Sequence, residues 1–256
     1  MSTPSKPSPW ANYLKEFLML FLAVSLGFWV ENLRQEREDR ETEQEFMSSL
    51  LEDLAEDSLK VAKAMVQSQQ KMEGFDSLIV RLNQDTYDDS TLRIIYYLNR
   101  RWSGYNPVVH FSERTLKELT STGTHRLIRN REIASAISHY QEQIQMAQRQ
   151  SSIGVSDFQI RTREVANRIY DARPSYGLTR ETARELLNPN RKMPPLLGTR
   201  EQFNEYLNWL MNLQSTVFYY RKGLEKTLPE IAALMALLEK EYGLPHPQKA
   251  AKRTPG

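Results

Sequence analysis

The hydrophobic residues of this chain form one long apolar run near the N-terminus, followed by segments with a 3-4 spacing. The run covers residues 17–30, fourteen positions without a charged side chain. Residues 10–14 extend it, so residues 10–30 form a 21-residue segment interrupted by Lys15 and Glu16. About 20 residues are needed to cross a hydrocarbon core of roughly 30 Å. We therefore predict a transmembrane helix over residues 10–30.

The residue types inside this segment fit a membrane helix. Trp10 and Trp29 stand near its ends, where interfacial aromatic residues sit, and Phe17 opens the uncharged run. Nine of the fourteen uncharged residues are Phe, Leu or Val. Their summed insertion free energy, about −3 to −5 kcal/mol, can offset two charges near the interface. Ala23 and Gly27 form a small-xxx-small pair, which either brings two spans together or belongs to an ordinary membrane helix.

Two other interpretations of the apolar run stay open. A cleaved signal peptide has a basic beginning and a small-x-small cleavage site. This chain offers Lys6, Lys15 and a weak site at residues 23–25. A buried helix of a soluble protein shows a polar stripe on one side, whereas residues 17–30 are apolar all round. The uncleaved single-pass anchor fits the residues best.

The charges on the two flanks of the span do not decide its topology. Lys6, Lys15 and the free amine lie before the span, and three arginines lie soon after it. Residues 31–57 contain eleven acidic residues against three arginines, a net charge of −8. Such a segment gains nothing from an anionic cytoplasmic leaflet. We expect the N-terminus inside and the large domain outside.

A strict 3-4 spacing of apolar residues follows the acidic segment. It keeps one register from Met47 to Leu82, across a single glycine, Gly74, which costs about 1 kcal/mol of helix stability. The spacing predicts a coiled-coil or bundle seam rather than a broad amphipathic face. No breaker separates Val30 from Met47, so we predict that the membrane helix continues outward as one rod, up to a break at residues 83–91.

The rest of the chain alternates between predicted helices and loops. The helices are expected over residues 91–102, 112–120, about 130–170, 180–187 and about 203–238. Asn130 and Thr179 stand at N-cap positions, and Gly123 suits a left-handed C-terminal cap. Gly154 is the weak point of the third of these helices.

The last helix has the clearest 3-4 register. Pro229 should kink it, and Thr227 and Glu230 stand at capping-box spacing to restart it. Gln214 and Arg221 are polar residues at seam positions. Such residues either fix the register of the pairing helices or lie at a wet edge of the bundle.

Three long seams with short connecting helices predict an all-α fold, with one transmembrane helix that continues into an antiparallel helical bundle. The predicted boundaries are a disordered tail over residues 1–9, the span over residues 10–30, a bundle domain over residues 31–243 and a disordered basic tail over residues 244–256.

Composition and motifs argue against several classes of function. A net charge of +2 argues against a nucleic-acid partner, and the absence of cysteine excludes disulfides and thiolate chemistry. The four histidines, His110, His125, His139 and His246, lack metal-ligand spacing. The chain also has no GxSxG, Walker-type or GxGxxG motif. We therefore expect no metal, no cofactor and no enzymatic activity.

One loop is a candidate for binding a ligand or partner. Arg100, Arg101, Trp102 and Tyr105 bring basic and aromatic side chains together, as in loops that bind nucleic acid or small anions. In the structural alternative, the aromatic side chains pack against the bundle and the arginines pair with acids. The sequence leaves both interpretations open.

Three stretches together resemble a known family. The stretch "KEFLMLFLAVSLGFWVENLRQERED" is followed by "EQEFMSSLLEDLAED" and, later, by "TLKELTSTGTHRLIRNREIASAISHYQ". The chain resembles the uncharacterised single-span membrane proteins abundant in Bacteroidota. Their Gly, Leu-Ile-x-Asn-x-Glu-Ile segment is matched by Gly123, Leu127, Ile128, Asn130, Glu132 and Ile133. The resemblance covers most of residues 10–145 and implies membrane attachment and a helical domain, without a known activity. The N-terminal tail departs from the family in being short and weakly basic.

These features predict a non-enzymatic protein of the bacterial inner (plasma) membrane, with a periplasmic bundle acting in protein–protein interaction or assembly. Its expected partners are the lipid bilayer and a second copy or another membrane protein. The alternative is an extracytoplasmic sensor-like bundle that binds a small anion through the arginine-rich loop. A sensor normally passes its signal to an output domain across the membrane, and the nine to fifteen residues before the span are too few for one.

Overall fold

The structure, a computed structural model, describes residues 9–121 and 123–247, and this part of the chain is all-α, with no strand. Its helices are α1 (Pro9–Leu82), α2 (Asp89–Trp102), α3 (Arg114–Ser121), α4 (Arg131–Arg149), α5 (Asp157–Ile169) and α6 (Arg200–Tyr242). Short helical turns lie between them: η1 (Thr124–Leu127), the π-helical η2 (Gln150–Ser156), η3 (Arg173–Ser175) and η4 (Thr182–Leu187). The all-α prediction is confirmed.

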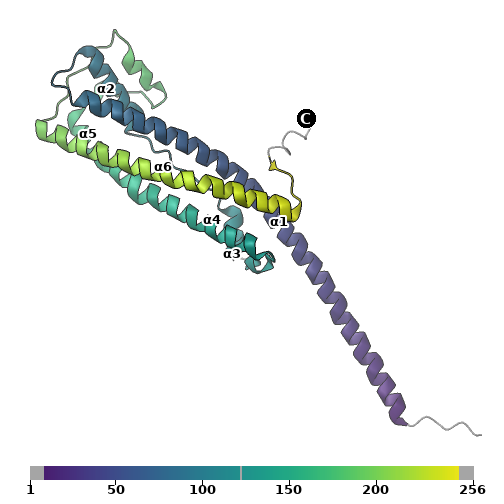
Figure 1. The fold of residues 1–256 in the computed structure, drawn as a ribbon. Helices are drawn as coiled ribbons and strands as arrows, with labels where there is room; N and C mark the ends of the chain where they lie inside the picture. Colours follow the sequence, from purple (N-terminus) through teal and green to yellow (C-terminus); the bar gives the residue numbers. More distant parts are fainter. Residues whose placement is uncertain (1–8, 122, 248–256) are drawn as a thin grey trace, which may run out of the picture.

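Helix α1 is a single helix of 74 residues. Its first part projects alone from the rest of the molecule, and its second part lies among the other helices (Figure 1). The predicted continuous rod is therefore confirmed, including its end at Leu82 before the turn at residues 83–88.

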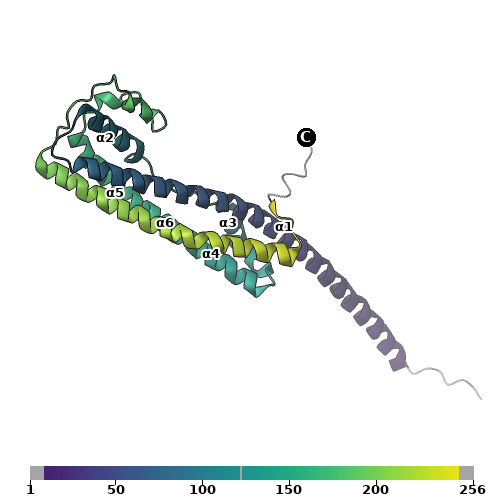
Figure 2. The ribbon, with the colours of Figure 1, turned by 45° about the horizontal axis from the view of Figure 1, so that its top comes forward.

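Helix α6 runs antiparallel to the second part of α1, and both views show the two side by side (Figures 1 and 2). Near the start of α6, Gln214 bonds to α1 at Met72, and near its end the Tyr242 hydroxyl lies 2.7 Å from Glu43 Oε1. Helices α4 and α5, joined by η2, pack along α6 on its other side. The core lies where these long helices meet.

The predicted seams are buried, but the prediction for α1 was too narrow. Met47, Leu54 and Phe75 lie in the core as expected. A second stripe of α1 is buried as well, and it includes Leu50 and Leu78. The reason is that α1 packs against α6 on one side and against α2, α3 and their connector on the other. The apolar surface is thus a broad face, because two neighbours cover it.

The predicted restart of the last helix at Pro229 is wrong. Helix α6 runs through this proline without interruption, and the Thr227 hydroxyl donates to the Gly223 carbonyl, 3.2 Å away, inside the helix. A proline costs one backbone hydrogen bond. The fully buried Leu224 and Ile231 on either side of Pro229 hold the helix against this cost.

The predicted caps at Asn130 and Gly123 are confirmed, and the third predicted helix is divided at its weak point. The helix predicted over residues 180–187 is instead the 3-10 helix η4, which begins at Thr182, and Thr179 Oγ1 accepts from the Thr182 amide and from the amide before it. The Asn130 side chain accepts from the Glu132 and Ile133 amides, and Gly123 has a φ of 69°. Around Gly154 the chain forms the π-helical η2 instead of a regular helix. A Cβ at Gly154 would lie 2.9 Å from the Thr216 methyl group, so glycine lets η2 approach α6 closely.

The two predicted tails lie mainly outside the described residues, which begin at Pro9 and end at Pro247. Gly243, with a φ of 64°, ends α6 in the left-handed conformation. After it, Leu244 packs partly buried against the core, and His246 Nδ1 lies 2.6 Å from Glu239 Oε1. Residues 244–247 thus turn back onto α6.

Candidate functional site

The first part of α1 is an exposed apolar surface. Every side chain from residue 13 to residue 38 is exposed, and Trp10 and Phe17 are 77% and 64% exposed. Trp29 and Ala23 are exposed too, and nothing lies within 4 Å of a Cβ built on Gly27. The residues predicted to span a membrane therefore share one uncovered stretch of helix.

Among the described residues, α1 is the one helix long and apolar enough to cross a membrane, as judged by length and composition. Its qualifying 18-residue window has a mean hydropathy of 1.6, and none of that window is buried. The core helix of a soluble protein can match this composition, but it is mostly buried. A signal sequence near the N-terminus passes the same test.

The predicted ligand loop is held together by its own arginines. Arg100 donates to the Leu178 carbonyl, and Arg101 Nη1 lies 3.1 Å from the Arg180 carbonyl oxygen. Trp102 is buried, and the Arg101 guanidinium lies 5.0 Å from its ring centroid. The structure thus uses these side chains to fasten α2 to the segment after η3, through carbonyls rather than through acids.

A further arginine, which the sequence did not single out, belongs to the same cluster. The Arg180 guanidinium lies 3.5 Å from the centroid of the Tyr105 ring and 5.6 Å from that of Trp102. The Tyr105 hydroxyl donates to Gln67 on α1. Arg180 lies 75 residues after Tyr105 and 78 residues after Trp102 in the sequence, so no local pattern could have revealed the pairing.

The two polar seam residues have different surroundings. Gln214 Nε2 donates to the Met72 carbonyl at 3.2 Å and to Asp76 Oδ1 at 2.6 Å, so it links α6 to α1. Arg221 pairs with Glu225, 2.5 Å away in the next turn of α6. Gln214 is thus a cross-helix contact, whereas the ion pair of Arg221 stays on its own helix.

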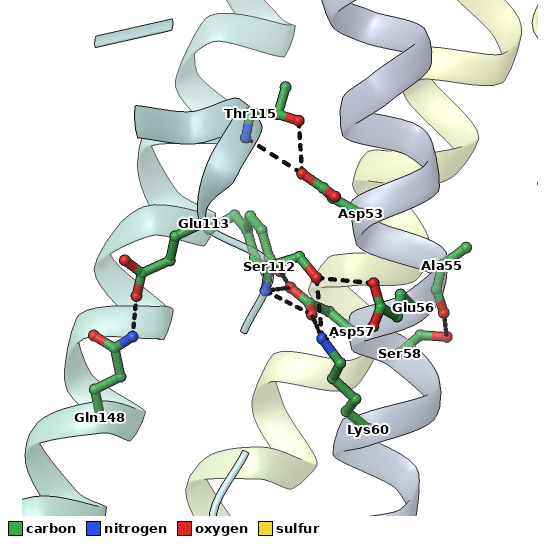
Figure 3. Close-up of polar contacts among 11 residues, drawn as sticks. Asp53, Ala55, Glu56, Asp57, Ser58, Lys60, Ser112, Glu113, Thr115 and Gln148 are labelled. Carbon is green, nitrogen blue, oxygen red and sulfur yellow. Dashed lines mark hydrogen bonds and ion pairs between the residues drawn. The ribbon is translucent and has the colours of Figure 1, made fainter. Parts of the chain in front are cut away.

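The sequence missed a buried polar network on α1 (Figure 3). The fully buried Asp57 carboxylate accepts from the Ser112 amide at 2.9 and 3.0 Å and from the Tyr140 hydroxyl at 2.7 Å. Lys60 Nζ lies 3.3 Å from Asp57 Oδ1. Burial, and then the neighbouring Asp57 charge, raise the pKa of Tyr140, so it stays a protonated donor.

Two more acids of α1 bind the same connector between α2 and α4. Asp53 accepts from the Thr115 hydroxyl at 2.6 Å (Figure 3). Glu43 accepts from the Arg129 amide at 3.1 Å. These buried carboxylates satisfy backbone and hydroxyl donors of the connector that would otherwise be buried without partners. The acids therefore position α3 and the start of α4 along α1.

Lys71 is the buried cation of α1. Its Nζ donates to the Tyr105 carbonyl, to Asn106 Oδ1 at 3.0 Å and to Gln159 Oε1 at 3.4 Å. Burial, followed by the charge of Arg180, lowers its pKa to about 7. The three acceptors are a carbonyl and two side-chain amides, so Lys71 joins α1, the loop after α2 and α5 through neutral groups.

The sequence contained an ambiguous signal for this buried polar network of α1. Asp53 and Asp57 stand four residues apart, beside the core residues Leu50, Leu54 and Val61. The same residues fall in the acid-rich segment, where a solvated face is the usual interpretation. Their partners are distant in the sequence: Ser112 lies 55 residues from Asp57, and Thr115 lies 62 residues from Asp53. Only the folded arrangement identifies the pair.

The described residues contain no group of three or more His, Asp or Glu side chains that could hold a metal ion. His139 lies between Glu142 and Glu230, and His246 lies beside Glu239. His110 is exposed, and the side chain of His125 is outside the described residues. The arrangement can therefore fasten helices and present surfaces. The chain matches no protein-family model, no curated protein and no solved structure.

Proposed function

We propose that this chain is a single-pass membrane protein, in which residues 10–30 span the bilayer and an antiparallel helical bundle acts in protein–protein interaction or assembly. One observation carries the proposal. The uncharged run at residues 17–30 is exposed on all sides, on a helix that continues without a break into the packed domain.

The free energy of exposing apolar side chains to water supports a membrane environment for this run. Burying a Val, Leu or Phe side chain away from water gains about 1.5–3 kcal/mol, and nine such residues stand in the exposed run. An apolar surface this continuous marks a contact with a membrane or another protein. A bilayer covers a helix from every side, as this helix requires. The hydrocarbon core offers no hydrogen bonds, and an α-helix needs none there because it pairs its backbone groups internally.

The segment after the span supports a spacer role. Residues 31–42 continue α1 with exposed or half-exposed side chains and cover about 18 Å at 1.5 Å per residue. Arg34 pairs with Glu31 at 2.6 Å along this segment. The bundle would therefore stand a short distance above the membrane surface. The periplasmic location of the bundle and the resemblance to the Bacteroidota proteins remain predictions.

The alternative function, binding of a small anion by the arginine-rich loop, has less support. The guanidinium groups of Arg100 and Arg101 already donate to backbone carbonyls. Arg180 is stacked on Tyr105. An anion would have to displace these contacts. A thermal-shift screen of small anions against the wild type and Arg101→Ala would reveal such a site as a ligand-dependent shift that the variant loses.

Extraction of membranes with alkaline carbonate tests the anchor. The wild-type chain should stay in the membrane pellet, whereas Leu20→Arg/Val24→Arg should move to the supernatant. Two arginines at the centre of a span cost about 5–7 kcal/mol, more than the apolar run gains. The matched control, Gln35→Arg/Gln44→Arg, adds the same charge at two exposed positions beyond the span and should stay in the pellet. Release of the wild type by carbonate would contradict the anchor.

The interaction role has its own test. Affinity purification of the detergent-solubilised chain should recover a second copy or a distinct membrane protein in a fixed ratio. A strictly monomeric chain that recovers no partner from native membranes would contradict that role, while leaving the anchor intact.

A further inference from the structure

A shallow groove runs along the outer side of α1 and α6. It consists of two hollows of about 270 and 410 Å³, and Leu228 lines both. Ala55 and Met235 border the first hollow, and Ala62 and Met65 border the second. The groove therefore follows the line along which these antiparallel helices meet, on the side not covered by α4 and α5.

Small residues form the floor of this groove, and larger apolar residues stand beside it. Ala62, Ala232 and Ala236 are exposed within it, while Leu59 and Val66 of α1 project with 60% and 58% of their surface exposed. Alanines let another helix approach closely, and projecting Leu and Val side chains fill such spaces. One surface thus carries both the projections and the hollows that would receive them.

The charged groups that line the groove are already paired within the chain. Arg221 pairs with Glu225, and His246 lies beside Glu239. A two-fold interface between identical chains brings the same surface together twice, so an unbalanced charge there would repel its own copy. A lining without an unbalanced charge therefore suits a second copy, whereas a charged partner would find no complementary group.

One donor in the groove lacks a partner. Arg221 Nε is buried and has no hydrogen-bond partner among the described residues. Gln69 and Gln70 of α1 line the same hollow, at the same height along the helices. A two-fold axis parallel to α1 keeps heights unchanged, so it brings a glutamine amide of one copy toward Arg221 of the other. Because Nε is already covered by its own chain, a second copy would contact the remaining exposed part of the Arg221 side chain, 24% of its surface.

From these observations we infer that the groove is the interface of a parallel homodimer. Each α1 then lies beside the α6 of the other chain, and the four helices form one antiparallel bundle around the two-fold axis. This inference rests on the proposed function, because a parallel axis is what two anchors in one membrane require. Ala23 precedes Leu59 by 36 residues, about ten turns of 3.6 residues, so the small pair of the span faces the same side of α1.

Two other exposed apolar side chains lie away from the groove. Ile153 and Ile160 are 64% and 54% exposed on η2 and α5. Neither lines either hollow of the groove. Ile153 therefore provides a matched control of similar size and exposure on a different face.

Cross-linking in native membranes tests the dimer directly, because the chain contains no cysteine. Val66→Cys and Ile153→Cys each introduce one thiol per chain, so a flexible bismaleimide can link only separate chains. We expect at least ten times more dimer from Val66→Cys than from Ile153→Cys. Adding Ala62→Arg to Val66→Cys should reduce the dimer at least tenfold, because Ala62 is exposed and the fold accepts the change while the interface does not.

Three results would overturn the inference: no dimer from Val66→Cys, equal dimer from both thiols, or a cross-linked band whose mass is not that of two chains. The carbonate extraction of the same membranes keeps this outcome separate from the proposed function. A chain that stays in the pellet but does not cross-link contradicts the dimer alone. A chain released by carbonate contradicts the anchor itself.

Discussion

The two parts of α1 place their side chains in opposite surroundings. From residue 13 to residue 38 every side chain is exposed, including the longest apolar run of the chain. From Met47 to Leu82 the same helix buries two charged side chains completely, those of Asp57 and Lys71. Apolar groups lie outside in the first part, and charges lie inside in the second.

This inversion has a different physical cause in each part. In the second part, the buried charges are held by specific partners, such as the Ser112 amide on Asp57 and the Asn106 side chain on Lys71. In the first part no other described residue covers the apolar side chains, and the proposed membrane would surround them in place of water. Both parts belong to the same continuous helix. What surrounds the helix decides which residues it tolerates.

Replacement of Asp57 should have the largest effect on the packed part. Asp57→Ala leaves the Ser112 amide and the Tyr140 hydroxyl buried without an acceptor, so we expect a loss of about 3–5 kcal/mol in the free energy of unfolding. Urea unfolding of the detergent-solubilised chain measures it. Glu52→Ala, an exposed acid on the same helix, should change the free energy by less than about 0.5 kcal/mol. Equal losses would show that burial of Asp57 is unimportant.

The next largest difference between the two parts of α1 is expected from alanine substitutions at Gly74 and Gly27. A Cβ at Gly74 would lie 2.3 Å from the Trp102 ring, so Gly74→Ala should destabilise the domain by about 1–3 kcal/mol despite its better helix propensity. Nothing lies within 4 Å at Gly27, so Gly27→Ala should leave the same unfolding transition unchanged. A stabilised Gly74→Ala would mean that Trp102 does not pack against this glycine.

The pH dependence of stability tests how Lys71 is buried. Its pKa is about 7 in the folded chain against an ordinary value of 10.5, so the unfolded chain binds more protons between these values. The free energy of unfolding of the wild type, relative to Lys71→Met, should therefore rise from about pH 7 to pH 10, by at most about 1.4 kcal/mol per pH unit. Parallel urea titrations at several pH values measure the difference. A pH-independent difference would mean that Lys71 keeps its proton throughout this range.

The smallest effect is expected in the exposed part. Arg34 pairs with Glu31, but both side chains are more than half exposed. Exposed ion pairs contribute little, so Arg34→Ala should leave the unfolding free energy of the domain unchanged within the error of the measurement. Urea unfolding of the detergent-solubilised chain measures this change in free energy. A loss comparable with that of Asp57→Ala would mean that residues 31–42 are part of the folded core.

Much of the architecture could be predicted because it depends on local patterns. The 3-4 spacing of Met47, Leu54 and Phe75 reports burial on a helix, and Asn130 caps a helix through amides only two and three residues away. Such information is contained in a few consecutive turns. The approximate positions of α2, α3 and α6 and the end of α1 at Leu82 therefore followed from the sequence, whereas the division between α4 and α5 and the 3-10 form of η4 did not.

The remaining features depend on residues distant in the chain. Asp57 meets Ser112 across 55 positions, and Trp102 covers Gly74, so neither contact has a local signature. The continuity of α6 through Pro229 likewise depends on core contacts from other helices. The candidate loop was identified by composition, but the carbonyl partners of Arg100 and Arg101 lie nearly eighty residues away. These contacts depend on tertiary packing, which the spacing of hydrophobic residues in the sequence does not report.

Thiol labelling compares the two parts of α1 most directly. Ser25 lies in the apolar run and Ser49 in the domain, and both are exposed in the folded chain. In unsealed membrane fragments, a membrane-impermeant maleimide should label Ser49→Cys at once and Ser25→Cys only after detergent is added. Equal labelling of the two thiols before detergent would show that water, and not lipid, surrounds the exposed apolar part of α1.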